Sequence, residues 1–177
     1  MIDAKEYGKA LFLITEEDRL SDKVLADVKT AERAFKENPD YVKLLDSPAL
    51  SKEERVELAG KAFSGLNDSL INLIKIMTER RSVRLFVKAA EEFYSLYDDS
   101  RGILRVEAVT AVPLTEGQRK NMTAKLGASL GKTVILLNTV DPSILGGVKL
   151  RYSGTQLDGS VKTRLDKFEA ALKNTVI

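Results

Sequence analysis

The sequence predicts an α+β protein with an N-terminal six-helix bundle over residues 1–100 and a small β-α-β-β-α domain over residues 101–177. Two observations predict this division. Apolar residues recur at helical spacing in the first part, whereas from residue 103 they alternate as in a half-buried strand. Residues 1–100 hold 3 glycines and a net charge of −4, and residues 101–177 hold 8 glycines and a net charge of +6. We therefore place the domain boundary near residues 98–102.

The first part is predicted to be helical in six segments, which begin near residues 3, 20, 39, 51, 66 and 83. Asp3 followed by Glu6 resembles a capping box, and Ser51 with Glu54 forms a second one. The second helix ends at Asn38 because the proline that follows disfavours helix in the preceding residue. The fifth segment, over 66–77, has little polar surface and must be largely buried.

The second part is predicted to hold three strands and two helices. Strands are expected over 103–112, 133–140 and 148–152, with a turn at 141–147. Thr115 with Gln118 caps the helix between the first two strands. A last helix begins at Asp158 or Ser160, and its buried stripe consists of Val161, Leu165, Phe168 and Leu172.

The composition excludes most enzyme chemistry. The chain has no Cys and no His, which removes disulfides, Cys–His zinc sites, thiol nucleophiles and His general bases. Gly131, Lys132 and Thr133 resemble the end of a phosphate-binding loop, but Leu126 stands where that loop requires glycine. The segment also runs from helix to strand, so we expect a helix C-cap at Gly131 instead. We predict no catalytic residue, no cofactor and no metal site.

Two surface features remain open. Arg80, Arg81 and Arg84 follow the fifth helix and could contact phosphate, but cations also suit the last turn of a helix, which is the favoured interpretation. The first and fifth helices carry more apolar surface than one-sided packing requires. They either lie at the centre of the bundle or present a groove to a partner helix. A protein with two unlike modules and no catalytic groups is better explained as a connector than as an enzyme.

A long segment near the C-terminus carries a specific resemblance. Residues 139–160, TVDPSILGGVKLRYSGTQLDGS, followed by VKTRL, resemble the C-terminal signature of the delta subunit of F-type ATP synthases, the family of the mitochondrial oligomycin-sensitivity-conferring protein. YGKALF at 7–12 and NLIKIMTER at 72–80 resemble the first and fifth helices of that family. Gly8 departs from the family pattern, in which alanine is common at this position. Glycine within a helix costs about 1 kcal/mol relative to alanine. The signature residues are Asp141, Pro142, Gly146, Gly147, Gly154, Asp158 and Ser160.

The resemblance implies a non-catalytic stator subunit of a proton-translocating ATP synthase. Its N-terminal domain would bind the N-terminal helices of alpha subunits in the catalytic head. Its C-terminal domain would hold the C-terminal end of the membrane-anchored b stalk, so that rotation is coupled to ATP synthesis. The protein would then lie at the cytoplasmic face of a bacterial cell membrane and reach the membrane only through the complex. The start of the chain lacks the pattern of a signal or transit peptide, in keeping with this expectation.

We expect the first and fifth helices to form the groove for the alpha-subunit helix. Periodicity alone does not separate residues that face the groove from residues that face the core. The candidate walls are Tyr7, Ala10, Leu11, Ile14, Leu70, Leu73, Ile74 and Met77.

The competing hypothesis is a nucleic-acid or ribosome-associated adaptor that uses the basic C-terminal half. Such a protein would need aromatic side chains on an exposed sheet, and Tyr152 is the only aromatic residue in the predicted strands. We therefore predict no nucleic-acid partner.

Overall fold

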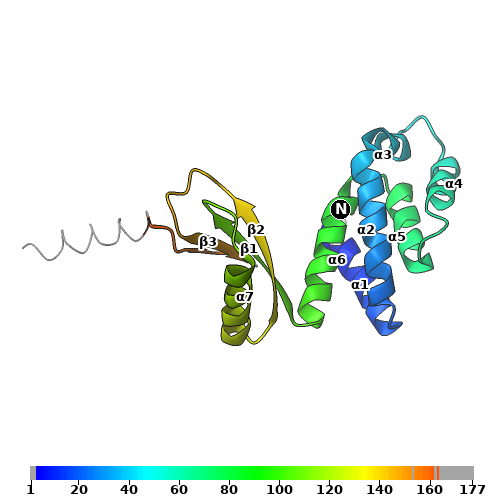
Figure 1. Ribbon diagram of the computed structural model, residues 1–177. Coiled ribbons are helices and arrows are strands. Elements are labelled where there is room, and N and C mark those ends of the chain that lie inside the picture. Colours follow the sequence, from blue (N-terminus) through cyan, green and yellow to red (C-terminus); the bar gives the residue numbers. More distant parts are fainter. Residues whose placement is uncertain (1–2, 153, 162, 164–177) are drawn as a thin grey trace, which may run out of the picture. The chain divides into compact units, whose positions relative to one another are not determined.

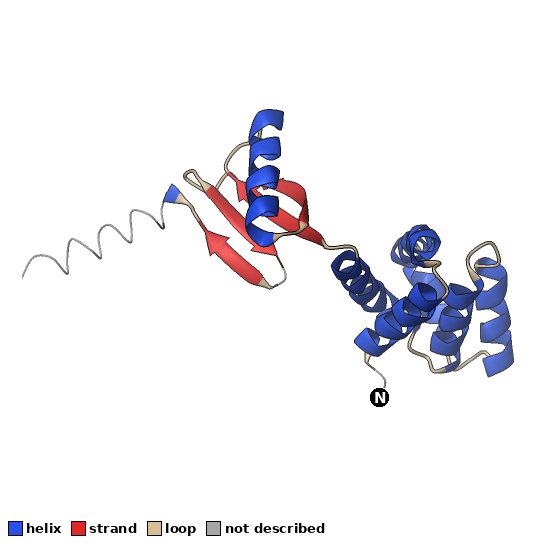
Figure 2. Ribbon diagram, turned by 90° about the horizontal axis from the view of Figure 1, so that it is seen from below, coloured by secondary structure: helices blue, strands red, loops and turns tan. Residues whose placement is uncertain are grey.

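The computed structural model describes residues 3–152, 154–161 and 163 (Figure 1). The chain divides into two compact units, Met1–Tyr97 and Asp98–Ile177. The first is built of helices, and the second combines strands with a helix (Figure 2). We call them the helical unit and the sheet unit. The predicted α+β class is therefore confirmed.

Each predicted helical segment of the first part is helical in the structure, and the sixth opens with a short 3-10 helix. Phe86 begins the α-helical part of that segment, and its last turn, from Asp98, belongs to the sheet unit. The elements are α1 (Ala4–Glu17), α2 (Ser21–Glu37), α3 (Pro39–Leu45), α4 (Lys52–Ala62), α5 (Asp68–Glu79), η1 (Val83–Leu85) and α6 (Phe86–Ser100).

Aromatic rings occupy the centre of the helical unit. The ring of Phe35 on α2 lies 4.9 Å, centroid to centroid, from the rings of both Phe63 and Phe86. Phe12 of α1 meets Phe93 of α6 edge-on at 6.2 Å. These rings belong to one buried apolar cluster that includes residues of α1, α2, α4, α5 and α6. Burial of this cluster is the main term that stabilises the unit.

The predicted capping boxes are confirmed at two of three helix starts. Ser51 and Glu54 form a reciprocal capping box, with the Glu54 amide donating to Ser51 Oγ at 3.2 Å. Thr115 and Gln118 form another at the start of the helix in the sheet unit. The box predicted at Asp3 is wrong, because the Asp3 side chain makes no cap hydrogen bond. The Glu6 amide, which would donate to the Asp3 side chain in a capping box, instead donates to the Asp3 backbone carbonyl at 3.1 Å.

Gly8 lies where α1 meets α6. A Cβ atom at this position would overlap the backbone oxygen of Ala89 and lie 2.8 Å from Glu92 Cβ. The missing side chain therefore allows the two helix backbones to approach closely. This close packing explains why a residue of low helix propensity stands in the middle of α1.

The sheet unit contains β1 (Ile103–Thr110), α7 (Glu116–Leu130), β2 (Thr133–Val140), β3 (Val148–Tyr152) and β4 (Thr155–Asp158). The strand order is β2-β1-β3-β4. β1 pairs parallel with β2, whereas β3 pairs antiparallel with both β1 and β4. The first three strands and the intervening helix were predicted, and Gly131 ends α7 with a left-handed φ of 64° as expected.

The fourth strand was not predicted. Thr155–Asp158 is short and carries one large apolar residue, so it has no clear alternation, and only its pairing with β3 defines it. The last helix was expected directly after the third strand. Val161 and Thr163 are helical, and the rest of its predicted stripe, Leu165, Phe168 and Leu172, lies outside the described residues.

One face of the sheet packs against α7. Leu104, Val106 and Ala108 of β1, with Val134 and Leu136 of β2, form the buried cluster on this face. Met122 and Leu126 are the α7 side chains that pack on it, and both are only half-buried. On the same face, Leu157 of β4 is 50% exposed. Among the described residues, α7 therefore leaves part of this face uncovered.

Candidate functional site

The first candidate site lies on the helical unit, where α1 and α5 pack against each other. At one end of this contact the hydroxyls of Tyr7 and Ser82 are hydrogen-bonded at 3.2 Å. Tyr7 lies in the first half of α1, and Ser82 follows the C-terminal end of α5. The two helices therefore run antiparallel here.

The structure separates the eight candidate wall residues into core and surface. Ile14 is 50% exposed and Ala10 is also exposed, whereas the other six are at most 8% exposed. Ile74, at 1% exposed, is a core residue and cannot touch a partner without local unfolding. The six buried side chains are Tyr7, Leu11, Leu70, Leu73, Ile74 and Met77.

Two further apolar side chains are exposed on the same helices. Leu13 of α1 is 55% exposed and Ile76 of α5 is 45% exposed. We call Ala10, Leu13, Ile14 and Ile76 the α1–α5 face. Leu13 and Ile76 were not among the predicted wall residues of the groove. The sequence did hold a signal for them, because both are apolar residues that lie outside the buried stripe of their helix. Large apolar groups exposed on adjoining helices are typical of a surface that binds a partner.

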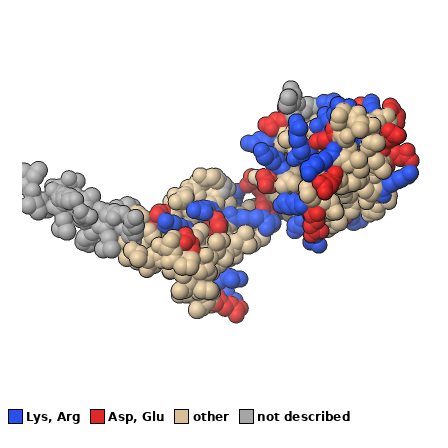
Figure 3. Space-filling model, turned by 90° about the horizontal axis from the view of Figure 1, so that it is seen from above, with Lys and Arg blue, Asp and Glu red and all other residues tan. Residues whose placement is uncertain are grey.

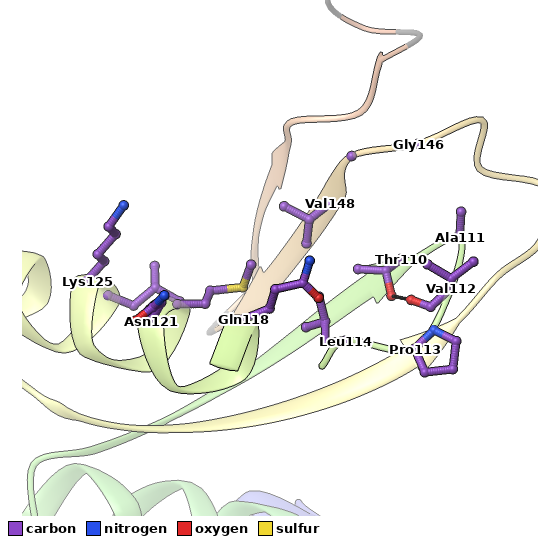
Figure 4. Close-up of a pocket in the computed structure, with 13 residues that line it drawn as sticks. Thr110, Ala111, Val112, Pro113, Leu114, Gln118, Asn121, Lys125, Gly146 and Val148 are labelled. Carbon is purple, nitrogen blue, oxygen red and sulfur yellow. Dashed lines mark hydrogen bonds between the residues drawn. The ribbon is translucent and has the colours of Figure 1, made fainter. Parts of the chain in front are cut away.

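The second candidate site is an apolar pocket of about 600 Å³ in the sheet unit. Figure 4 shows Gln118, Asn121 and Lys125 of α7 on one side and Val148 at the start of β3 on the other. The segment after β1 closes one end, where Thr110 Oγ1 donates a hydrogen bond of 2.7 Å to the carbonyl of Val112. The remaining lining residues are Ala111, Pro113, Leu114, Met122, Leu126, Gly146 and Gly147.

The C-terminal signature shapes the edge of this pocket. The amide of Gly159 donates to the Val148 carbonyl and that of Val161 donates to the Gly146 carbonyl, each at 3.0 Å. Gly147 has a φ of 84°, and a Cβ atom there would lie 2.5 Å from the Gly159 oxygen. The two halves of the signature, which are separated in sequence, are thus joined through glycine backbone that no larger residue could replace.

The two signature carboxylates serve as hydrogen-bond acceptors in turns. Asp158 Oδ1 accepts from the Ser160 amide at 2.8 Å, and these hydrogen bonds to Ser160 lower the pKa of Asp158 to about 2. Asp141 Oδ1 accepts from the Ser143 amide at 2.9 Å, and its hydrogen bonds to Ser143 likewise lower its pKa. Ser160 Oγ in turn accepts from the Thr163 amide at 3.3 Å. These groups hold the shape of the loop.

The other two signature residues lie in turns. Gly154, with a φ of 75°, lies between β3 and β4, and Pro142 is exposed in the turn after β2. Neither residue lines the apolar pocket. The signature thus preserves backbone shape more than a set of reactive groups.

The features that suggested catalysis have structural partners. Lys132, the lysine of the phosphate-loop-like sequence, forms an ion pair with Asp99 at 3.0 Å. No group of three or more metal-ligating side chains is found within the described ranges. None of the helices in the described part of the chain is both long and apolar enough to cross a membrane.

Comparison with known proteins decides the family. The sequence model described as "ATP synthase delta (OSCP) subunit" matches residues 4–172. The chain belongs to the ATP synthase delta (OSCP) subunit family. It is 33% identical over 172 residues to ATP synthase subunit delta of Geobacillus sp. (strain WCH70), with 97% of each chain covered. It is 30% identical over 175 residues to the subunit delta of Clostridioides difficile (strain 630), covering 98% and 97%.

The fold is shared with a chain of a solved structure. A chain in the cryo-EM structure of the Toxoplasma gondii mitochondrial ATP synthase hexamer superposes with a TM-score of 0.74 at 21% identity, covering 97% of this chain and 98% of that one. Membership of the delta (OSCP) family makes the chain a peripheral-stalk subunit of an ATP synthase, a structural subunit of a membrane-associated complex. Its partners are other ATP synthase subunits. The resemblance found in the sequence is confirmed.

Proposed function

We propose that this chain is the stator link between the catalytic head and the b stalk of a proton-translocating F-type ATP synthase, at the cytoplasmic face of a bacterial membrane. The family match carries the proposal, because it extends through both units, from residue 4 to residue 172. Each unit also exposes its own apolar surface. One chain with two separate docking surfaces suits a connector.

The work of such a link is mechanical. The rotor turns inside the head, and a head that is not held would turn with it, so no free energy would reach the catalytic sites. Each interface must therefore dissociate slowly. Buried apolar contacts meet this need better than exposed ion pairs, which salt screens.

The α1–α5 face is proposed to bind the N-terminal helix of an alpha subunit. Its exposed side chains, Ala10, Leu13, Ile14 and Ile76, lie on two packed helices and so present apolar area to one partner helix. Burial of several hundred Å² of apolar surface contributes on the order of 10 kcal/mol before ordering costs, at about 25 cal/mol per Å². Nanomolar affinity is consistent with that magnitude.

The pocket of the sheet unit is proposed to receive the C-terminal end of the b stalk. α7 leaves one part of the sheet face uncovered, and the pocket between α7 and β3 opens there. Val112, which is 68% exposed at the end of this pocket, presents a large apolar group to a partner. A helix with an apolar stripe would cover both the pocket and the adjoining strands.

The test uses the full chain with two matched pairs of variants. Ile14→Asp should abolish calorimetric binding of an alpha-subunit N-terminal peptide, whereas Leu44→Asp should not, because Leu44 is 42% exposed on α3. Val112→Lys should weaken binding of a b-stalk C-terminal fragment. Leu137→Lys should not, because Leu137 is 54% exposed on the opposite face of the sheet.

Each arm of this test can fail separately. If Ile14→Asp binds the alpha peptide like wild type, the head is not bound by the α1–α5 face. If the Val112 and Leu137 variants bind the b fragment equally well, the pocket is not the stalk site. Circular dichroism of every variant checks that the loss of binding is not loss of fold.

A further inference from the structure

We propose that the α1–α5 face selects a helix with an acidic end, and that Arg80, Arg81 and Arg84 receive its carboxylates. The inference rests on the proposed function, since it specifies the partner of that same face. These arginines follow α5, and all three are exposed. The sequence favoured the last turn of the fifth helix for them, but α5 ends at Glu79 and has no basic residue in its last turn.

Arg80 continues the α1–α5 face. It comes four residues after Ile76, so the two side chains lie on the same side of the helix end. The hydrogen bond between Tyr7 and Ser82 places the turn that carries the arginines against α1. A helix lying on the apolar face therefore passes the arginine turn at one end.

The turn is held in one backbone conformation. The Ser82 amide donates to the Met77 carbonyl at 2.8 Å, and the Arg80 amide donates to the Ile76 carbonyl at 3.1 Å. Arg81 adopts a left-handed φ of 52°, which is uncommon for a residue with a side chain. The three cations thus extend from a fixed base, which lowers the ordering cost of binding.

No ion pair is formed by these three arginines within the part of the chain that the structure describes. Glu79, the residue before Arg80, pairs with Lys52 at 2.5 Å and interacts with the charge of Arg80 only at longer range. Asp3, the N-cap of α1, and Glu6 in its first turn lie toward the same end, and the described structure shows no ion pair from either to the arginines. The three positive charges are therefore available to an incoming partner (Figure 3 shows the distribution of charge on one side of the molecule).

The opposite end of the face is acidic. Glu17 and Asp18 lie at the C-terminal end of α1, and Asp68 begins α5, which runs antiparallel to α1. All three are exposed, and so is Arg19, which follows Asp18 and leaves this end with a net charge of −2 over the four residues. The face therefore carries positive charge at one end and net negative charge at the other, and it favours a helix with the complementary charges.

Two designed amphipathic peptides test this selection against the full chain. They share one apolar stripe, spaced so that the helix fits the face in one direction only, and at the end that meets the arginines one carries Glu residues where the other carries Lys. Binding is measured by calorimetry at about 0.01 M and about 1 M salt, where the Debye length is about 30 Å and about 3 Å. The variants are Arg80→Gln with Arg84→Gln, and Arg33→Gln as the control. Arg33 is exposed on α2, on the side opposite the buried stripe.

At low salt we expect the wild-type chain to bind the Glu peptide at least about fivefold more tightly than the Lys peptide, since each exposed pair contributes about two- to fivefold. The preference should vanish at high salt and in the double variant, and persist in Arg33→Gln. Arg80→Glu with Arg84→Glu should reverse it, because two carboxylates then outweigh the one cation left at Arg81. If the double variant keeps the preference, or wild type shows none, the inference is wrong. Ile14→Asp distinguishes failure of this inference from failure of the proposed function. If Ile14→Asp binds both peptides as tightly as wild type, the α1–α5 face is not the docking site.

Discussion

Replacement of Gly8 by alanine tests the packing of α1 in a way that reverses the usual expectation. In a helix exposed to solvent, this change stabilises by about 1 kcal/mol, because alanine has the higher helix propensity. In this protein the new methyl group would overlap the backbone oxygen of Ala89 and lie 2.8 Å from the Cβ atom of Glu92. A backbone atom has no rotamer to change, so α1 and α6 would have to separate.

The magnitude follows from these opposing terms. Overpacking of a well-packed site costs about 1–3 kcal/mol and occasionally more. Because the overlap is with backbone, we expect the upper part of that range, about 2–3 kcal/mol. After the gain of about 1 kcal/mol in propensity, Gly8→Ala should lower the free energy of unfolding by about 1–2 kcal/mol. A change of about 1 kcal/mol shifts the melting temperature of a domain of this size by about 4–8 °C.

Gly60→Ala is the matched control in the same unit. A Cβ atom at Gly60 would lie 2.9 Å from Lys75 Cε, the far end of a flexible side chain that can move aside. This variant should therefore be neutral or more stable than wild type. Urea unfolding of the full chain, followed by far-ultraviolet circular dichroism, measures both. If Gly8→Ala is stabilised as much as Gly60→Ala, the close approach of α1 and α6 does not constrain this position.

Three further predictions concern other parts of the chain. Ile74→Asp should unfold the helical unit, because it places an unpaired carboxylate at a position that is 1% exposed. Ile14→Asp should leave the melting curve nearly unchanged. Equal melting of the two variants would contradict the assignment of Ile74 to the core and Ile14 to the surface. Gly147→Val should disrupt the sheet unit, since φ at this position is 84° and the backbone oxygen of Gly159 lies against it. A native circular dichroism spectrum together with native stalk binding would contradict this prediction. Asp158 has a pKa of about 2 in the folded protein, against an ordinary value of 3.8. Its ionised form therefore stabilises the folded loop above about pH 4, and this contribution is lost as the pH falls toward 2. In urea titrations from pH 5 to pH 2, Asp158→Asn should lose less stability than wild type; parallel pH curves would contradict the prediction.

Much of the secondary structure could be predicted because it depends on local chemistry. Side-chain spacing places apolar groups on one side of a helix, proline ends α2, and two reciprocal caps begin α4 and α7. The strand over Thr133–Val140 was predicted to the residue, since Gly131 and Asp141 bound a β-branched run. The exception at Asp3 shows that a residue pattern permits a cap without requiring one, because the backbone carbonyl can accept the same amide.

The sequence by itself determined the family, the order of most elements and the absence of Cys and His chemistry, because these depend on residue identity and spacing along the chain. Only the tertiary structure decided which apolar residues of α1 and α5 are core. Ile14 and Ile74 are chemically identical, and their exposure of 50% and 1% is set by the helices packed around them. β4 depends on pairing with β3, and Gly8 on the position of α6. These are contacts between residues distant in sequence, which periodicity within one segment does not contain.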